Sequence, residues 1–478
     1  MVLQQDMPIK IWGTAKPAEK VQVSFGNQHA SCVASKSGNW HVVLEEAELG
    51  PARELKVQGE NLVLFKDVQV GEVFLCAGQS ELLDSLKSLP AAEHGLAKAN
   101  SSNKLRFFIV PKKVSASPSA VLAGGWKVSS GNSGSGNSGS GNNSSGNNSS
   151  GDKTTLAECS ALAYNLGRNL EANLKVPVGI IDCSYPETPI ASWISKDRLM
   201  QMSVFRPILD SNAKAAEAAT TPDGKPTLSS VSKPCVAYNG MVAPLVGYAL
   251  KAVVWYQGLH DLGQAVSYRK LLPMLIRDWR VRWAQEPDIP FFFVQLPSSA
   301  IASNTFDINS LAACIGVENS WVNMRDAQAS ALAVGSSSMI VTTDYAQHHS
   351  LNQLDGLPGR ISQAILTKLF EGKKTAFGPL YEGYDSQGSA IKVHFSNAKD
   401  GLALRLKVGQ PTGFEMIDTK GRIFPAEVKI VDHDLLVSSP QIVNPIEVRY
   451  DWKDVAKATL FNVENLPAAP FRISIRPN

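Results

Sequence analysis

The spacing of apolar residues changes along the chain. In residues 1–70, short segments either alternate apolar and polar residues, as in Val21–Phe25, or are rich in β-branched and aromatic residues, as in Trp40–Leu44. Alternation with a period of two is typical of strands that have one buried face. This part of the chain therefore predicts a small β-sandwich or sheet.

From Gly71 to about Phe370, unbroken apolar runs alternate with amphipathic stretches. The candidate strands are Val73–Cys76, Leu105–Val110, Val178–Ile181, Lys251–Trp255, Phe291–Val294 and Met339–Thr342. Helices are expected at Leu156–Leu174, Ala265–Ala284, Val322–Leu332 and Gly359–Leu369. Continuous apolar runs between helices are the sequence form of a parallel α/β sheet.

After Lys373 the chain returns to short β runs, which predicts a second β-rich region. We therefore expect an α/β protein with an N-terminal β-rich domain at 1–70, an α/β domain at 71–376 and a C-terminal β-rich domain at 377–478. Residues 129–151 contain only Ser, Gly and Asn. Such a segment cannot bury a core and is expected to be a flexible insertion.

Composition narrows the class of protein. The 478 residues are 44% hydrophobic and 19% charged, which fits a globular protein of more than one domain. Lys and Arg total 46 against 43 for Asp and Glu, and this balance argues against nucleic acid or an anionic membrane as an obligatory partner. No run approaches the roughly 20 apolar residues of a membrane span. The six cysteines include no CxxC pair, so zinc ribbons and dithiol redox motifs are not expected.

Polar loops follow three of the predicted strands, where a parallel sheet carries its functional groups. Gly78-Gln-Ser80 follows the first strand, Gln257–Asp261 follows another, and Asp344–Asn352 contains His348 and His349. A serine, a histidine and a carboxylate are what acyl transfer to water requires, because the imidazole takes the serine proton and the carboxylate orients the imidazole. The alternative is that these residues have no catalytic role, because serine in a turn commonly caps a helix and histidines in loops are commonly solvated.

A set of distinctive stretches occurs in order along nearly the whole chain. They are Met1–Gln4, Ile11–Gly13, Gly71–Ser80, Pro177–Ile181, Thr188–Ile190 with Trp193, Tyr238–Leu245, Val254–Gly258, Asp278–Arg280, Phe293–Leu296 and Arg325–Gln328. Together they resemble the sialate O-acetylesterase family, carbohydrate esterases of the SGNH hydrolase type. The resemblance implies an SGNH-like parallel-sheet core between β-rich segments.

The resemblance also implies a function. It implies removal of O-acetyl groups from sialic acid or another sugar, with no metal and no cofactor. Family members usually carry an export signal ahead of the stretch that here begins at Met1. A periplasmic or extracellular location is therefore expected, although no signal peptide precedes Met1 in this sequence.

Catalytic roles follow from the resemblance, residue by residue. Ser80 occupies the place of the nucleophile that forms an acetyl-enzyme, and His349 occupies the place of the general base. The acid of the family is missing from its usual place, and Asp344 or Asp355 is the candidate to orient His349. At the oxyanion and substrate positions the resemblance puts Glu187, Asp261, Gln257 and Asn239.

The catalytic loops depart from the family. Glu81 follows the nucleophile where the family has Asn, and Glu187 stands in the turn where the family has Gly. Asp261 replaces an Asn whose amide donates to the oxyanion. An ionised carboxylate only accepts hydrogen bonds, and losing one oxyanion donor typically costs about 10²–10³ in turnover.

Three interpretations stay open from the sequence. The chain is a working carbohydrate esterase; or it is a weak or inactive relative that binds glycans, with Tyr185, Trp193 and Tyr256 as stacking or packing residues; or it carries a new metal site. The candidate ligands of that site are Glu81, Glu187, His260, Asp261, His348 and His349.

Other positions have structural alternatives. Gln257 and Arg325 could contact substrate or support residues that do, and Met241 near Asn239 is explained equally well by packing. Trp279 and Trp283 are four residues apart, which predicts the core face of a helix.

Overall fold

The structure is a computed structural model. It describes residues 1–78, 85–88, 103–129, 155–211, 228–298, 320–345, 354–372, 375–406 and 412–476. The chain divides into two compact units, and each is described by itself. The first unit is Met1–Trp255 with Met274–Phe291, and the second is Tyr256–Pro273 with Phe292–Asn478.

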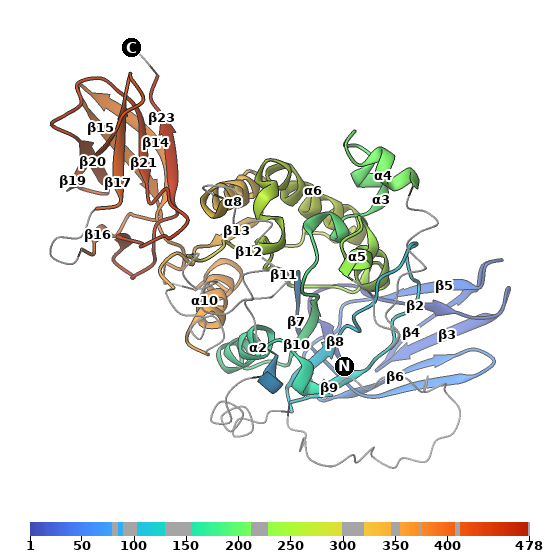
Figure 1. Cartoon of the computed structure of the whole chain (residues 1–478). Helices are drawn as coiled ribbons and strands as arrows, with labels where there is room; N and C mark the ends of the chain where they lie inside the picture. Colours follow the sequence, from blue (N-terminus) through green and yellow to red (C-terminus); the bar gives the residue numbers. More distant parts are fainter. Residues whose placement is uncertain are drawn as a thin grey trace. The chain divides into compact units, whose positions relative to one another are not determined.

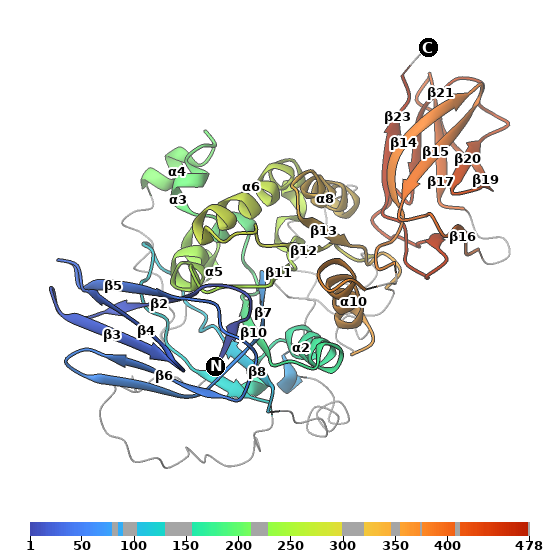
Figure 2. The same ribbon diagram turned by 180° about the vertical axis from the view of Figure 1, so that it is seen from behind.

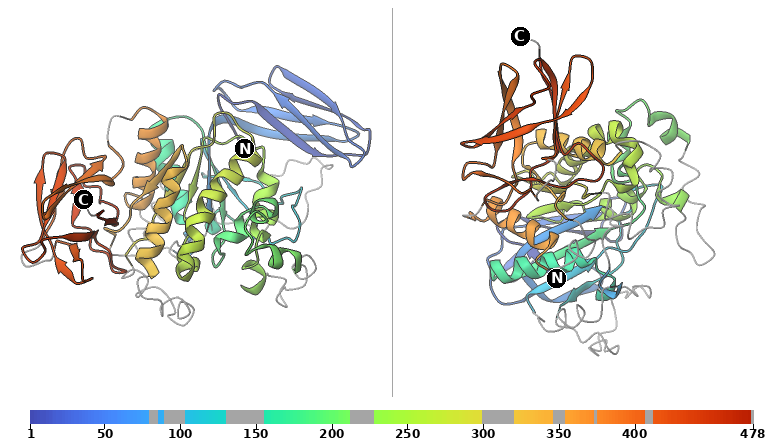
Figure 3. Two further views of the ribbon diagram at one scale, coloured as in Figure 1. Left: turned by 90° about the horizontal axis from the view of Figure 1, so that it is seen from above. Right: turned by 60° about the vertical axis from the view of Figure 1, so that its left-hand side comes forward.

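The first unit begins with a β-sandwich (Figure 3). Its strands are β1 (Val2–Gln4), β2 (Ile9–Thr14), β3 (Lys20–Phe25), β4 (Gln28–Val33), β5 (Asn39–Leu44) and β6 (Arg53–Gln58). Strands β2 and β5 pair with each other, and β3 lies between β4 and β6. Alternate residues of β3 and β5 are buried and form one core with Leu55 and Val70. This is the half-buried pattern that the sequence predicts.

Strand β7 (Leu62–Gly78) joins this sandwich to the central sheet. Its first half pairs antiparallel with β6, and its second half lies between the parallel strands β10 (Val178–Ser184) and β11 (Ala252–Trp255). Strand β8 (Leu105–Ile109) runs parallel to β10, and β9 (Trp126–Val128) pairs antiparallel with β8 (Figure 1). The second half of β7 is completely buried, as continuous apolar strands of a parallel sheet are.

Helices and short helical turns complete the first unit. They are η1 (Leu86–Ser88), η2 (Leu156–Glu158), α2 (Ala161–Leu174), η3 (Ile190–Trp193), α3 (Lys196–Leu199), α4 (Arg206–Ser211), α5 (Leu228–Val231), η4 (Tyr238–Val242), η5 (Ala243–Leu245) and the second half of α6 (Ala265–Trp283). Helix α2 packs on β8 and β10 through its buried side chains. Trp279 and Trp283 of α6 are buried with ring centroids 5.9 Å apart, which confirms the predicted core face.

The second unit starts with η6 (Leu259–Gln264) and the first half of α6. It continues with β12 (Phe291–Val294, whose first residue belongs to the first unit), α8 (Ser320–Ala329), η8 (Ser330–Ala333), β13 (Ser337–Ile340) and α10 (Leu357–Leu369). Strands β12 and β13 are hydrogen-bonded neighbours.

A C-terminal β region ends the second unit (Figure 2). Its strands are β14 (Leu380–Gln387), β15 (Ala390–Ser396), β16 (Leu402–Leu404), β17 (Phe414–Asp418), β18 (Ile423–Pro425), β19 (Glu427–Val431), β20 (Asp434–Ser438), β21 (Pro445–Tyr450), β22 (Leu460–Asn462) and β23 (Phe471–Ser474). Two four-stranded sheets, in the orders β14-β15-β20-β19 and β18-β17-β21-β23, share one apolar core.

The expected fold class is confirmed: parallel strands of a central sheet are accompanied by β-rich segments at both ends of the chain. The boundaries at 70/71 and 376/377 stay predictions, and β7 runs without a break through the first of them. Residues 130–151 of the expected flexible insertion lie outside the described residues. Among the helices in the described part of the chain, none is long and apolar enough to cross a membrane.

Candidate functional site

The carboxyl ends of three parallel strands align in the first unit. Gly78, the last residue of β7, is in register with Ser184, the last residue of β10, and Trp255 at the end of β11 is opposite Ala77. Gly78 has a φ of 107°, a conformation that favours glycine. Ser80 comes two residues later and lies in 79–84, outside the described residues.

The segment after β10 forms a tight turn over Tyr185–Thr188. The N–H of Tyr185 donates to the carbonyl oxygen of Gly78 at 2.9 Å, so this turn is tied to the end of β7. Pro186 occupies the second position and Glu187 the third, with a φ of 62°. A proline followed by a residue of positive φ is the pattern of a type II turn, whose third position favours glycine. Glu187 is exposed and holds the conformation that the family's glycine adopts more easily.

Asn239 lies in η4, a single π-helical turn, and its side chain is buried. Its Nδ2 donates to the carbonyl oxygen of Ser115 at 3.1 Å, and its own carbonyl oxygen accepts from the N–H of Ser119 at 2.8 Å. A Cβ added to Gly240 would come within 2.2 Å of the Lys113 carbonyl oxygen, so only glycine lets the two segments approach this closely. These contacts give Asn239 a structural role in holding the segment that follows β8.

Gln257 and Asp261 are brought together in the second unit. The Nε2 of Gln257 donates to Oδ2 of Asp261 at 2.5 Å, and both side chains are buried. The main-chain carbonyl of Gln257 accepts from Nε2 of Gln328 at 2.9 Å and from the hydroxyl of Tyr268 at 3.2 Å. The loop that follows β11 is therefore held from α8 and α6, with a carboxylate where the family has an amide.

Arg325 of α8 is fully buried, and its partners among the described residues are main-chain carbonyl groups. Its Nε donates to Leu296, and its two terminal nitrogens donate to Pro297, Lys453 and Asp454, at 2.7 to 3.0 Å. Burial lowers the pKa of this guanidinium to about 10. The structure thus favours support of the main chain over substrate contact, the two alternatives that the sequence leaves open.

Asp344 forms a two-pronged ion pair with Arg360 at the start of α10. Its oxygens accept from Nη1 at 2.8 Å and from Nη2 at 2.6 Å, and Nη1 also donates to the Val341 carbonyl oxygen. An ionised carboxylate can accept further hydrogen bonds beyond this pair. His348 and His349 lie in 346–353, outside the described residues, so the role of Asp344 beside His349 stays a prediction.

Asp182 is a buried polar residue that the sequence analysis does not identify. In β10 its carboxylate accepts from the N–H of Ser160 and from the hydroxyl of Ser184, both at 2.7 Å. Burial raises its pKa, while these hydrogen bonds and the charge of Lys112 act in the opposite direction. A single Asp inside an apolar strand is the signal that could have found it. It fixes Ser184, the residue before the Tyr185–Thr188 turn.

The aromatic residues near the strand ends are mostly core. Trp193 is completely buried and Tyr256 nearly so, which makes both packing residues. Tyr185 is half-buried, and Nζ of Lys112 lies 6.0 Å from its ring centroid.

The metal-site interpretation is not supported by the described residues. Among them, no group of three or more His, Cys, Asp or Glu side chains could hold a metal ion. Glu81, His348 and His349 lie outside the described residues, so part of the proposed ligand set remains a prediction.

A surface hollow of about 450 Å³ lies on the N-terminal sandwich, far along the chain from the candidate residues. It is lined by cross-strand rows of polar side chains from β3, β4 and β6, which include Gln22, Ser24, His29 and Lys56. None of the candidate site residues lines it.

Comparisons with known proteins bear on this arrangement. The chain is 28% identical over 330 residues to the sialate O-acetylesterases of Pongo abelii and Homo sapiens. The chain is thus similar in sequence to the sialate O-acetylesterases. The matched region is 64% of this chain, and the chain spans 57% of the length of these relatives. No family model matches it.

A solved structure of a carbohydrate acetylesterase from Xanthomonas citri superposes with a TM-score of 0.78 at 24% identity. The match covers 99% of this chain and 97% of that protein. This likeness establishes the fold: the β-rich ends and the α/β core of this chain recur together in a solved protein.

Proposed function

We propose that this chain is a carbohydrate O-acetylesterase with Ser80 as its nucleophile. The names of its relatives and the order of the shared stretches support hydrolysis of an acetyl ester on a sugar. O-acetylated sialic acid is the first substrate to test, and other acetylated sugars are the alternative. The proposal needs no metal and no cofactor.

One observation carries the proposal. The hydrogen bond from the Tyr185 N–H to the Gly78 carbonyl fastens the Tyr185–Thr188 turn to the strand that leads into Ser80. A turn with exposed main-chain N–H groups beside a nucleophile is the type of structure that stabilises an oxyanion. Pro186 has no N–H to offer, so the N–H of Glu187 is the donor we propose.

The proposed reaction has two steps, formation of an acetyl-enzyme and its hydrolysis. The Ser80 oxygen attacks the acetyl carbonyl carbon while His349 takes its proton, and the oxyanion accepts from the Glu187 N–H. Collapse of this intermediate breaks the bond to the sugar oxygen, which leaves with the proton from His349. Water then attacks the acetyl-enzyme, again with His349 as the base, and acetate and free Ser80 result.

Asp344 is the acid that we propose to orient His349, which follows it by five residues. Its two hydrogen bonds with Arg360 hold the carboxylate in a fixed orientation, as an orienting acid requires. Asp355 is the alternative, and its side chain is exposed.

A second function is favoured by one specific observation, the buried carboxylate of Asp261. At the position of an amide donor, a carboxylate repels the developing negative charge. If this charge prevents turnover, the chain binds acetylated glycans without cleaving them. Binding of the acetylated sugar without release of acetate would identify this function.

The proposed mechanism is tested at His349, and the adjacent His348 provides a matched control. The enzyme is treated with a serine-directed organophosphonate, and the labelled residue is located by mass spectrometry. We expect label on Ser80 in the wild type and in His348→Asn, and labelling at least about 10²-fold slower in His349→Asn, because general-base catalysis is lost. Equal labelling of both histidine variants would contradict the role of His349, and absence of label on Ser80 would contradict the proposed mechanism.

A further inference from the structure

A continuous series of hydrogen bonds links helix α6 to the end of strand β7 in the first unit. The indole N–H of Trp279 donates to the carbonyl oxygen of Trp193 at 3.0 Å, and the indole N–H of Trp193 donates to Oγ1 of Thr188 at 2.9 Å. The Thr188 hydroxyl donates to the carbonyl oxygen of Tyr185 at 2.7 Å, and the N–H of Tyr185 donates to Gly78. Glu187 lies inside the turn that this series encloses.

The Thr188 hydroxyl is the link that connects the turn to the core. It is completely buried and uses its oxygen to accept from Trp193 and its single proton to donate to Tyr185. A hydroxyl that both accepts and donates in a dry site is fixed in orientation. Its loss leaves the buried indole N–H of Trp193 and the carbonyl oxygen of Tyr185 without this partner.

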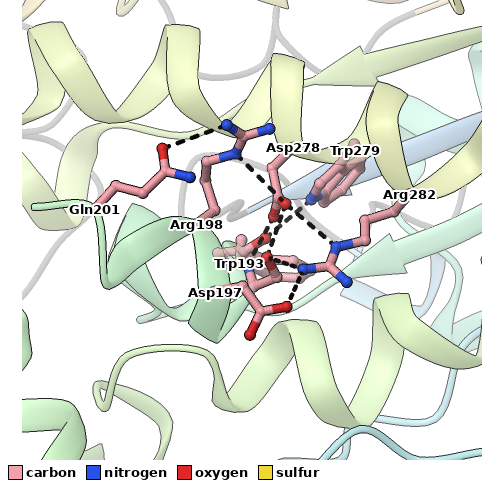
Figure 4. A network of polar contacts seen from close by, with 8 residues as sticks. Trp193, Asp197, Arg198, Gln201, Asp278, Trp279 and Arg282 are labelled. Atoms are coloured by element: carbon pink, nitrogen blue, oxygen red, sulfur yellow. Dashed lines mark hydrogen bonds and ion pairs between the residues drawn. The ribbon is translucent and has the colours of Figure 1, made fainter.

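The far end of the series is anchored firmly. Asp278, next to Trp279, accepts from the N–H and the hydroxyl of Ser195 at 2.8 and 2.7 Å. Figure 4 shows its carboxylate between the guanidinium groups of Arg198 and Arg282. The rings of Trp193 and Trp279 also each contact Trp255 edge-on, with centroids 5.8 Å away.

We infer that Thr188 is a positioning residue that holds the Glu187 N–H in place for the oxyanion. This inference rests on the proposed function. A non-glycine residue with a φ of 62° persists only where its surroundings over-determine the backbone. The Thr188 hydroxyl closes the turn from one side, and the Tyr185–Gly78 hydrogen bond closes it from the other.

The predicted kinetic signature follows from this indirect role. The Thr188 side chain is completely buried and its hydroxyl is bonded to Trp193 and Tyr185, so its loss should leave binding of the ground-state ester nearly unchanged. The oxyanion exists only in the transition state and the intermediate, so a displaced N–H lowers kcat instead of raising KM.

Three variants test the inference by acetate release from an activated acetyl ester. Thr188→Val keeps the shape and removes the hydroxyl, Thr188→Ser keeps the hydroxyl, and Ser192→Ala removes a buried hydroxyl that donates to the Pro189 carbonyl instead. We expect kcat to fall about 10–100-fold in Thr188→Val with KM changed less than about twofold. In Thr188→Ser and Ser192→Ala, kcat should stay within about threefold of the wild type.

A further variant guards against misfolding. If near-ultraviolet circular dichroism shows that Thr188→Val is unfolded, Trp193→Phe is measured in its place. It removes the indole donor and some buried ring volume but keeps the Thr188–Tyr185 hydrogen bond, and kcat should fall about threefold to tenfold. If folded Thr188→Val has the kcat of the wild type, the inference is overturned. If Thr188→Val is unfolded, wild-type kcat in Trp193→Phe overturns it instead. An equal loss of kcat in Ser192→Ala would also overturn it. Ser80-dependent turnover of the wild type would still support the proposed function in each of these cases. A wild type without Ser80-dependent acetate release would overturn both.

Discussion

Asp278 takes both hydrogen-bond donors of Ser195, the main-chain N–H at 2.8 Å and the hydroxyl at 2.7 Å. This pair joins α6 to the start of α3, and the side chain of Asp278 is almost completely buried. The segment that follows β10 is therefore held by a helix residue 83 positions later in the sequence.

Replacement of Asp278 by Asn is expected to lower the free energy of unfolding by about 2–3 kcal/mol, because one donor of Ser195 and two guanidinium groups lose their carboxylate. Urea denaturation measures this change. Asp197→Asn is the control: its carboxylate also pairs with Arg282 but is 79% exposed, so a change below about 1 kcal/mol is expected. Equal effects of the two substitutions would contradict the central place of Asp278.

Replacement of Glu187 by Gly is expected to relieve backbone strain and to remove a negative charge near the proposed oxyanion. Strain of a non-glycine residue in the left-handed region is about 1–2 kcal/mol, and the greater freedom of unfolded glycine offsets about half of it or more. The unfolding free energy should therefore stay equal or rise slightly, while kcat rises. Glu187→Gln removes the charge and keeps the strain.

These two variants separate charge from strain. A rise of kcat in both variants attributes the effect to charge, and a rise in Glu187→Gly alone attributes it to backbone conformation. A clear fall of kcat in Glu187→Gly would contradict our description of the turn.

Replacement of Asp261 by Asn restores an amide at the position where the family has one. The hydrogen bond with the Gln257 amide can persist, because the Asn side-chain oxygen accepts as the carboxylate did. Since one oxyanion donor is worth about 10²–10³ in turnover, we expect kcat for acetyl-ester hydrolysis to rise by at least about tenfold. Unchanged or lower kcat in a folded variant would show that this position does not face the oxyanion.

Asp182 provides a prediction about pH. Burial raises its pKa above the ordinary 3.8, so the native protein binds more protons than the unfolded chain between these two values. The contribution of Asp182 to stability is therefore greatest below pH 3.8 and is lost as the pH rises through the raised pKa.

The variant Asp182→Asn has no proton to lose and carries only a constant change in its hydrogen bonds to Ser160 and Ser184. The free energy of unfolding of this variant, minus that of the wild type, should therefore increase from about pH 4 to about pH 7. Denaturation curves at several pH values measure this difference, and a difference that does not vary with pH would contradict the prediction.

Much of the fold could be predicted from the sequence because fully buried strands leave unbroken apolar runs. Val73–Cys76 and Phe291–Val294 lie in the structure as strands β7 and β12. The length of β7 could not be predicted. Lys66 and Asp67 are exposed and interrupt its apolar pattern, and the domain boundary expected at 70/71 falls within the strand.

The candidate site was only partly accessible to the same reasoning. The local pattern identifies the Gln257–Asp261 loop, since it lies directly after an apolar run, whereas Glu187 was identified only through the family resemblance. Asp182 and Thr188 were not identified as functional, because the partners that define their roles come from packing. Ser160 and Trp193 become partners only when α2 and η3 pack beside β10 and the turn that follows it.

Acetate release is the measurement that tests the central proposal most directly. It compares wild type, Ser80→Ala and the control Ser88→Ala on an activated acetyl ester and on O-acetylated sialic acid. We predict release by the wild type and by Ser88→Ala, and none above background by Ser80→Ala. Equal release by wild type and Ser80→Ala, or none by either, would contradict a serine esterase.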